Sequence, residues 1–554
     1  MIDEEKAGND TQNALTVERA AWIGVGLLAA GLRLFQLGLR PLAEGEAVQA
    51  LAAYRFTQGA EQLAPAGTIP ALFTANAVVF SLTGDSDMAA RLLPVLAGLI
   101  LVLLPYGLRH RLGRGGALAA ALLITFSASA VHFSRTLDSA IVVAACGLAL
   151  VVGLIDYLDA RRTAGIYLAA AALGIGLCAG AGTYTLLLIF ALFGLALFLG
   201  AKLLARTSGW SSLATAWSDL RGGKGLLGRT AIVLASAFGL TATTLVLHPA
   251  GIGLAADLIG TWARGFLPDP GGQSFLYPLL VLLRYETLLL VLATVEAAWV
   301  LLHSRTDPQW SAQPRSAFPH TAFFTFWAVA GGIVVLVAGN RPAGAVMVLV
   351  VPLALLAGQG LERAWRWVSR HELWPSAALF AAVALGLLAF LYLQLGFYSH
   401  ASPTEAKRIA DLTLYTLSAH LMLVSVSVLL LIALGAAVWI WRGREMVIAG
   451  GWLAILVGLG LLQFQVMWGL GFFRANDSRE LMISEATAPG VRELAVQMEA
   501  LSLDEAGARY TLPITRDEAT GPVVAWYLRD FKDQAVVTGL SHPPDTLAAV
   551  TLFM

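Results

Sequence analysis

Long apolar stretches alternate with short polar ones along almost the whole chain. Thirteen apolar stretches approach or exceed the length that a membrane-spanning helix needs, and they lie near residues 20–37, 91–108, 115–131, 139–158, 164–180, 184–204, 229–248, 277–302, 321–339, 343–361, 375–397, 418–441 and 447–469. The apolar segment 70–83 is shorter, and we expect it to lie at the membrane surface or to re-enter the bilayer without crossing it. The pattern predicts an all-α polytopic membrane protein of about thirteen helices.

Polar segments at the two ends of the chain lie outside this helical domain. Residues 1–18 are predicted to be disordered. Residues 471–554 are polar again and show the pattern of one helix, near 488–501, and of two strands, near 509–514 and 535–538. A segment of this size with both kinds of element is predicted to form a small α/β domain.

The composition restricts the class of protein and its partners. Hydrophobic residues make up 58% of the chain and charged residues 13%, which is typical of a membrane protein. The formal net charge is zero, so nothing indicates nucleic acid as a partner. The two cysteines, Cys146 and Cys178, both lie in apolar stretches and predict neither a disulfide framework nor a metal motif.

The distribution of basic residues predicts the orientation in the membrane. A cytoplasmic N-terminus puts the larger share of the loop lysines and arginines on the cytoplasmic side, as the positive-inside rule requires. We therefore expect a transmembrane domain at 19–470, a first outer loop at 39–90, and an extracytoplasmic C-terminal domain at 471–554.

Two carboxylates in the first outer loop are the first candidates for chemistry. Glu44 and Glu46 directly precede apolar residues at helical spacing, which predicts a short amphipathic helix along the membrane surface. One interpretation is that both carboxylates stabilise the positive N-terminus of this helix. The other is that one of them takes a proton from a reacting hydroxyl group.

Charged residues in or beside the apolar stretches need polar partners, because lipid does not solvate them. Arg284 and Glu286 are two positions apart and point in different directions, so each requires a partner on another helix or a watery cavity. Arg135 and Asp138 are three apart, which allows either a local ion pair or a place in a site. Arg341, in a short loop, either reaches the membrane interface or binds a phosphate.

Short motifs in a fixed order resemble the C superfamily of membrane glycosyltransferases, which includes the protein O-mannosyltransferases and the transferase that decorates lipid A with aminoarabinose. The motifs are RPLAEGEAV in the first outer loop, RLLP from Arg91, the basic turn 109–114, and HFSRTLDSAI. The stretches LLRYETLLL, PLALLAGQGLE and AWYLRDF are similar to a prokaryotic branch called the flippase-activity-associated membrane proteins.

This resemblance implies a multi-pass plasma-membrane enzyme that transfers a sugar from a polyprenyl-phosphate donor to an extracytoplasmic glycan, lipid or protein. By the resemblance, the carboxylates are the catalytic candidates and the helix-end residues bind substrate. The catalytic candidates are Glu44, Glu46 and Asp138, and the substrate-binding candidates are Arg135, Arg284, Tyr285, Glu286 and Arg341. A divalent cation such as Mg²⁺ or Mn²⁺ could bridge carboxylate and phosphate, but no ligand set for it is evident.

The chain departs from that branch at two positions. Gly45 stands where the branch carries an aspartate, and Asn340–Arg341 stands where it carries Glu-Lys. Two functions therefore stay open. The protein is either an active transferase, with a neighbouring glutamate in place of the aspartate, or a catalytically inactive accessory protein. The accessory protein would bind lipid-linked saccharide in the export or assembly of cell-surface glycans, with glycan-assembly proteins as partners.

Overall fold

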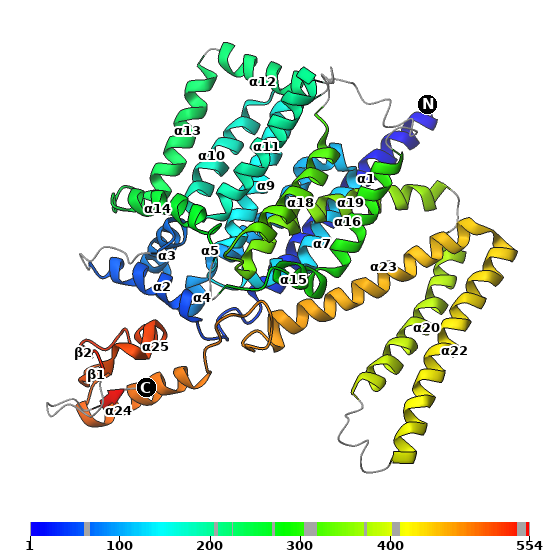
Figure 1. Ribbon diagram of the computed structural model, residues 1–554. Coiled ribbons are helices and arrows are strands. Elements are labelled where there is room, and N and C mark those ends of the chain that lie inside the picture. Colours follow the sequence, from blue (N-terminus) through cyan, green and yellow to red (C-terminus); the bar gives the residue numbers. More distant parts are fainter. Residues whose placement is uncertain are drawn as a thin grey trace. The chain divides into compact units, whose positions relative to one another are not determined.

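Helices make up most of the regular structure in the computed structural model (Figure 1). The structure describes residues 2–59, 67–203, 209–223, 225–268, 272–303, 318–370, 374–400, 410–539 and 550–552. The chain divides into two compact units, the first formed by Met1–Gln359 with Met467–Met554 and the second by Gly360–Val466. The candidate site lies in the first unit.

The described part of the chain contains eight helical segments long and apolar enough to cross a membrane, or up to eleven if each of three bent helix pairs counts as one. The eight are Leu92–Leu112, Ala140–Ala160, Gly182–Leu203, His320–Val337, Ala343–Ser369, Trp374–Gly396, His420–Arg442 and Arg444–Phe473. The bent pairs are α7 (Arg114–Phe126) with α8 (Ala128–Ser134), α12 (Trp210–Gly222) with α13 (Leu226–Ala242), and α15 (Tyr277–Tyr285) with α16 (Thr287–His303). The protein is thus a mostly helical polytopic membrane protein, as predicted.

The predicted number of thirteen spans is higher than this range. The two remaining predicted segments are helical as well, in α1 (Ile2–Leu34) and α10 (Thr163–Ala179). Helix α10 has only 17 residues, and α1 carries the charged residues Glu18, Arg19 and Arg33. Helix α1 begins at Ile2, so it includes the polar residues for which disorder was expected.

The remaining long helices follow the same apolar pattern. In the first unit they are α5 (Leu92–Leu103), α9 (Ala140–Ala160), α11 (Gly182–Leu203) and α18 (His320–Val337). Helices α19 (Met347–Arg370) and α23 (Arg444–Trp468) each continue from one unit into the other. The second unit also contains α20 (Trp374–His400) and α22 (Ala410–Arg442), and small buried residues such as Ala381, Ala384 and Ala454 form one of its apolar clusters.

Short helices gather at one end of the first unit, opposite α12 (Figure 1). They are α2 (Glu44–Thr57), α3 (Pro70–Thr83), α4 (Asp87–Ala90) and α14 (Gly251–Arg264). The start of α2 at Glu44 confirms that a helix begins at the acidic pair. Helix α3 has 14 residues, so it is too short to cross a bilayer.

The C-terminal region combines helices with a small parallel sheet. Its elements are α24 (Gly490–Ala506), β1 (Ile514–Asp517), α25 (Gly521–Tyr527), β2 (Gln534–Val537) and β3 (Val550–Leu552). The sheet has the order β2-β1-β3, and both neighbours run parallel to β1. This confirms a mixed helix and strand region at the C-terminus.

The first strand lies later in the chain than the predicted 509–514. The hydroxyl of Ser502 accepts hydrogen bonds from the backbone N–H groups of Thr511 (3.1 Å) and Leu512 (3.2 Å). These two N–H groups therefore face α24 instead of a neighbouring strand. Sheet pairing starts only at Ile514, which is opposite Gln534.

The C-terminal region is attached to the first loop by side chains that converge on one carboxylate. Asp87 of α4 accepts hydrogen bonds from the indole of Trp526 (2.7 Å) and the hydroxyl of Tyr527 (2.6 Å), and it pairs with Arg492. A second ion pair joins Arg529 to Asp85. The sequence that follows the last transmembrane helix thus returns to the end of the molecule that carries Glu46.

Candidate functional site

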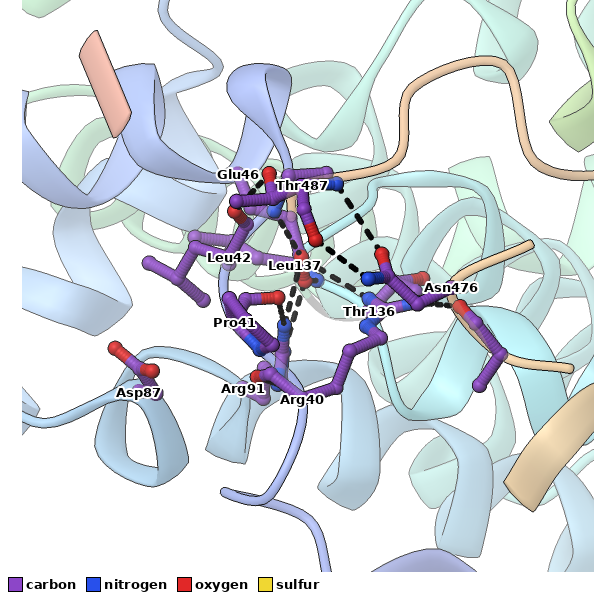
Figure 2. A network of polar contacts seen from close by, with 12 residues as sticks. Arg40, Pro41, Leu42, Glu46, Asp87, Arg91, Thr136, Leu137, Asn476 and Thr487 are labelled. Atoms are coloured by element: carbon purple, nitrogen blue, oxygen red, sulfur yellow. Dashed lines mark hydrogen bonds and ion pairs between the residues drawn. The ribbon is translucent and has the colours of Figure 1, made fainter. Parts of the chain in front are cut away.

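Glu46 is the centre of a polar network at the start of α2 (Figure 2). It is the third residue of the helix, and its Oε2 accepts the backbone N–H of Ala43 at 2.9 Å. This contact satisfies an N–H group that a helix leaves unpaired at its first turn. The predicted helix-terminus role is therefore present for Glu46, whereas Glu44 is exposed and has no such contact among the described residues.

Arg91 holds Glu46 by a bidentate ion pair. Its Nε donates to Oε1 at 2.8 Å and its Nη2 to Oε2 at 2.7 Å. The other N–H groups donate to the carbonyl oxygens of Leu37 (3.0 Å), Arg40 (2.9 Å) and Pro41 (3.1 Å). A guanidinium has five N–H donors, so every donor of this fully buried side chain has an acceptor.

The other contacts of Glu46 leave it no free acceptor. Oε1 also accepts the backbone N–H of Leu137 at 2.7 Å, and Oε2 accepts Arg40 at 3.0 Å. Burial alone would raise the pKa of Glu46, but the charges of Arg91 and Arg40 and the hydrogen bonds outweigh burial and hold the pKa well below its usual range. Glu46 is therefore a fixed anion that joins the first loop to the 135–139 loop, and it is poorly suited to accept a proton.

A polar cavity of about 230 Å³ opens next to this network. Its lining includes Glu46, Asp138 and Arg341, which the sequence analysis proposed for one site. It also includes Arg40 and Glu485. The cavity thus combines two arginines with three carboxylates drawn from four separate segments of the chain.

Asp138 lies on the wall of this cavity, just before α9. Its Oδ1 accepts the backbone N–H of Ala140 at 2.7 Å. Burial raises the pKa of Asp138, the hydrogen bond from Ala140 lowers it, and the charge of Glu46 raises it further. The net shift of the Asp138 pKa is upward from its usual value.

The alternative of a local ion pair between Arg135 and Asp138 is wrong. Helix α8 ends at Ser134, so both residues lie in a loop where helical spacing does not apply. Arg135 donates to the carbonyl oxygens of Arg33 (3.1 Å) and Phe35 (2.7 Å) at the end of α1. It caps that helix and is absent from the cavity lining.

Arg341 lies in the loop before α19 and reaches across to the loop before α15. Its Nη1 donates to the carbonyl oxygen of Gln273 at 2.8 Å, while Nε and Nη2 donate to that of Leu336 at 3.3 Å. These contacts hold a partly exposed cation at the cavity wall. Gln273 lines the same cavity.

The Arg284–Glu286 motif lies at the bend between α15 and α16, and none of its three residues lines the polar cavity. Arg284 and Tyr285 both contact Glu480, at 3.5 Å and 2.5 Å. Glu286 instead accepts the hydroxyl of Ser127 at 2.7 Å, at the bend between α7 and α8. The prediction that Arg284 and Glu286 point to different partners on other segments is confirmed.

An apolar cavity of about 290 Å³ adjoins the polar one. The two cavities share Asp138, Pro342 and Gly344 in their linings. The apolar cavity lies between α9, α11, α14, α18 and α19, and Trp262 and Trp327 are among its lining residues. The polar cavity and the apolar cavity therefore meet at the carboxylate of Asp138.

Metal binding was left open by the sequence. In the described ranges, no group of three or more His, Cys, Asp or Glu side chains is arranged to hold a metal ion. The carboxylates in the lining of the polar cavity are Glu46, Asp138 and Glu485.

Three site residues were not predicted from the sequence: Arg40, Arg91 as the partner of Glu46, and Glu485. Arg40 and Arg91 begin the motifs RPLAEGEAV and RLLP, and a buried carboxylate in the first loop requires a cation. Glu485 carried no signal, because the residue it contacts, Gly45, is 440 positions away.

One family model matches part of the chain. Residues 69–217 match the family described as dolichyl-phosphate-mannose-protein mannosyltransferase. No curated protein matches the chain.

Solved structures show which known fold the chain has. ArnT from Cupriavidus metallidurans bound to undecaprenyl phosphate is similar over 94% of this chain and 86% of ArnT, with 14% identity and a TM-score of 0.53. The apo state of the same protein is similar over 95% of this chain and 87% of ArnT, with 15% identity and a TM-score of 0.50. The apo oligosaccharyltransferase from Archaeoglobus fulgidus is similar over 95% of this chain and 65% of its own, with 12% identity and a TM-score of 0.50. The fold is therefore ArnT-like.

Proposed function

We propose that the protein transfers a sugar from a polyprenyl-phosphate donor to an acceptor on the outer side of a prokaryotic plasma membrane. The observation that carries this proposal is the meeting of the polar and apolar cavities at Asp138. A polyprenyl-phosphate sugar has a charged head and a long apolar tail, so it needs both environments side by side. The names of the matching family and of the ArnT complex, which contain dolichyl phosphate and undecaprenyl phosphate, support the same donor class.

Arg341 and Arg40 are the cations proposed to bind the donor phosphate. Arginine suits this task because its planar guanidinium forms paired hydrogen bonds with phosphate oxygens. Both side chains line the polar cavity, and Arg341 belongs to the loop that also contributes Pro342 and Gly344 to the apolar one. The phosphate would then lie at the junction, with the lipid tail directed into the apolar cavity.

Asp138 is proposed to face the departing phosphate. A charged carboxylate would repel it, whereas the protonated acid, toward which the upward shift of the Asp138 pKa is directed, can donate a hydrogen bond to the phosphate oxygen. Stabilising the negative charge that develops on a leaving group is usually a large part of catalysis.

The orientation predicted from the basic residues explains why the donor would be carried by lipid. Nucleotide sugars are made in the cytoplasm, whereas the cavity faces outward in that orientation. Glu44, Arg135, Arg284, Tyr285 and Glu286 are outside the cavity lining, so we propose that they support the site from a distance and do not contact the substrate.

A second candidate function is a non-enzymatic one, in which the protein binds lipid-linked saccharide during glycan export or assembly. The observation that favours it is that both carboxylate oxygens of Glu46 already accept hydrogen bonds from the protein. The neighbouring residue, Gly45, carries no carboxylate. Binding without transfer distinguishes this role from the first.

The test is transfer and binding by the purified protein in lipid nanodiscs. With a panel of radiolabelled polyprenyl-phosphate sugars, we expect turnover by the parent. Arg341→Ala should weaken polyprenyl-phosphate binding by about 1.5–3 kcal/mol, the usual contribution of a charged hydrogen bond, and Arg341→Lys should restore part of it. Arg264→Ala, a change at an exposed arginine on α14, is the matched control and should bind like the parent. Binding without turnover for every donor would favour the accessory role.

A further inference from the structure

Glu485 brings a carboxylate from the C-terminal region to the start of α2. Its Oε2 accepts the backbone N–H of Gly45 at 2.9 Å, and its side chain lines the polar cavity together with Asp138 and Arg341. No partner contacts its second oxygen, Oε1, in the part of the chain that the structure describes. Glu485 therefore has an available acceptor, unlike Glu46.

The backbone on both sides of Glu485 is fixed by polar contacts. On one side, buried Glu480 is bound by Tyr285 at 2.5 Å and by Arg474 at 2.6 Å. On the other side, the hydroxyl of Thr487 donates to the carbonyl oxygen of Leu42 at 2.8 Å (Figure 2). A side chain on a segment held at both ends loses little freedom when it meets a substrate.

The three cavity carboxylates differ in what they can do. Glu46 has no free acceptor and a depressed pKa. Asp138 lies where the polar cavity meets the apolar one, beside the proposed phosphate position. Glu485 is exposed and lines only the polar cavity, not the apolar one. An acceptor dissolved in water would arrive on this side.

We propose that Glu485 is the general base for the acceptor hydroxyl. This inference rests on the transferase activity proposed above. Glu485 Oε1 takes the acceptor proton while the acceptor oxygen forms a bond to the anomeric carbon of the sugar. The bond from that carbon to the phosphate oxygen breaks, and its electron pair leaves with the polyprenyl phosphate. No oxidant or further reactant is needed.

The geometry at Gly45 allows the carboxylate to be moved. Gly45 is a helical residue, and a Cβ atom built on it lies 3.6 Å from Glu485 Oε2, an ordinary contact distance. An aspartate at position 45 would therefore put its carboxylate beside the position that the Glu485 carboxylate occupies. With Glu485 present, two carboxylates would repel each other, whereas with a glutamine at 485 the new aspartate could replace the base.

The experiment measures transfer and polyprenyl-phosphate binding for the parent, Glu485→Gln, Gly45→Asp and the double variant Gly45→Asp/Glu485→Gln. Glutamine still accepts the Gly45 N–H, so the segment keeps its anchor. We expect Glu485→Gln to lower kcat by about 10²-fold or more, the usual contribution of a general base, with binding unchanged. The double variant should recover at least about tenfold over Glu485→Gln. Glu493→Gln, at an exposed glutamate on α24 outside the cavity, is the matched control and should match the parent.

The outcomes separate this inference from the proposed function. If the parent turns over and Glu485→Gln retains the parent rate, Glu485 is not the base and the transferase proposal stands. A Glu485→Gln protein that loses binding and rate together shows a role in holding the site, which also overturns the inference. A parent that binds polyprenyl phosphate but transfers no sugar from any donor overturns the proposed function, and the role of Glu485 fails with it.

Discussion

Replacement of Arg91 by methionine removes the buried cation that holds the site together. Methionine has a similar length and keeps the apolar stem, but it leaves Glu46 buried without its bidentate partner. It also leaves the carbonyl oxygens of Leu37 and Pro41 without their Arg91 donor. Breaking a buried ion pair by removing one partner costs about 3–5 kcal/mol. We expect a loss of this size because Arg91 is fully buried and uses every donor.

The assay is unfolding in mixed micelles with rising SDS, followed by tryptophan fluorescence. Arg91→Met should lower the free energy of unfolding by about 3–5 kcal/mol, and Arg91→Lys should lose less because the charge remains. Arg55→Met is the matched control, since Arg55 is exposed on α2, and it should change the free energy by less than about 0.5 kcal/mol. A loss below about 1 kcal/mol in Arg91→Met would refute the view that this pair is the centre of the site.

The same pair predicts a dependence on pH. The pKa of Glu46 is lower in the folded protein than its unfolded value of about 4.3. The stability that its charge contributes is therefore fully present above this value and is lost as the pH falls through the folded pKa. Glu46→Gln removes this contribution, so the difference in unfolding free energy between parent and variant should shrink on acidification below about pH 4. A difference that grows on acidification would contradict the assignment.

Three further predictions follow from the fold and the cavity. In a cysteine-free background, Glu44→Cys should react with a membrane-impermeant thiol reagent in intact cells and Arg221→Cys should not; the reverse pattern would overturn the orientation. Asp87→Asn should weaken the attachment of the C-terminal region by about 1.5–3 kcal/mol, because hydrogen bonds to a charged group are lost, and limited proteolysis of that region should become at least about tenfold faster; unchanged cleavage would mean that Asp87 does not hold it. Asp138→Ala should lower transfer, and Asp138→Asn, which can still donate a hydrogen bond, should lower it less; equal rates in both variants would exclude hydrogen-bond donation to the phosphate.

The helices could be predicted from the sequence because the length of an apolar stretch is a local property. All thirteen predicted segments are helical in the structure. The pattern did not predict where helices bend, such as the 62° bend after Phe126 and the 99° bend at Glu286. The polar residues at these bends, Ser127 and Glu286, contact each other although they are 159 positions apart in the sequence. The apolar pattern of one segment does not predict such a contact with a distant segment.

The site was predictable only in part, for the same reason. The cavity joins Glu46, Asp138 and Arg341 as proposed, because each residue lies at the same predicted end of its helices. The helical spacing of Arg135 and Asp138 predicted a contact that does not form, because a loop separates α8 from α9. Glu485 could not be found, because its contact with the first loop depends on how the C-terminal region folds back.

The central claim is that the adjoining cavities bind one polyprenyl phosphate. The most direct measurement is a cryo-electron microscopy structure of the protein in a nanodisc with undecaprenyl phosphate. We expect density for the phosphate in the polar cavity, within hydrogen-bond distance of Arg341 or Arg40, and density for the lipid tail along the apolar cavity past Trp262. A well-resolved lipid bound elsewhere, with both cavities filled only by water or side chains, would contradict the account.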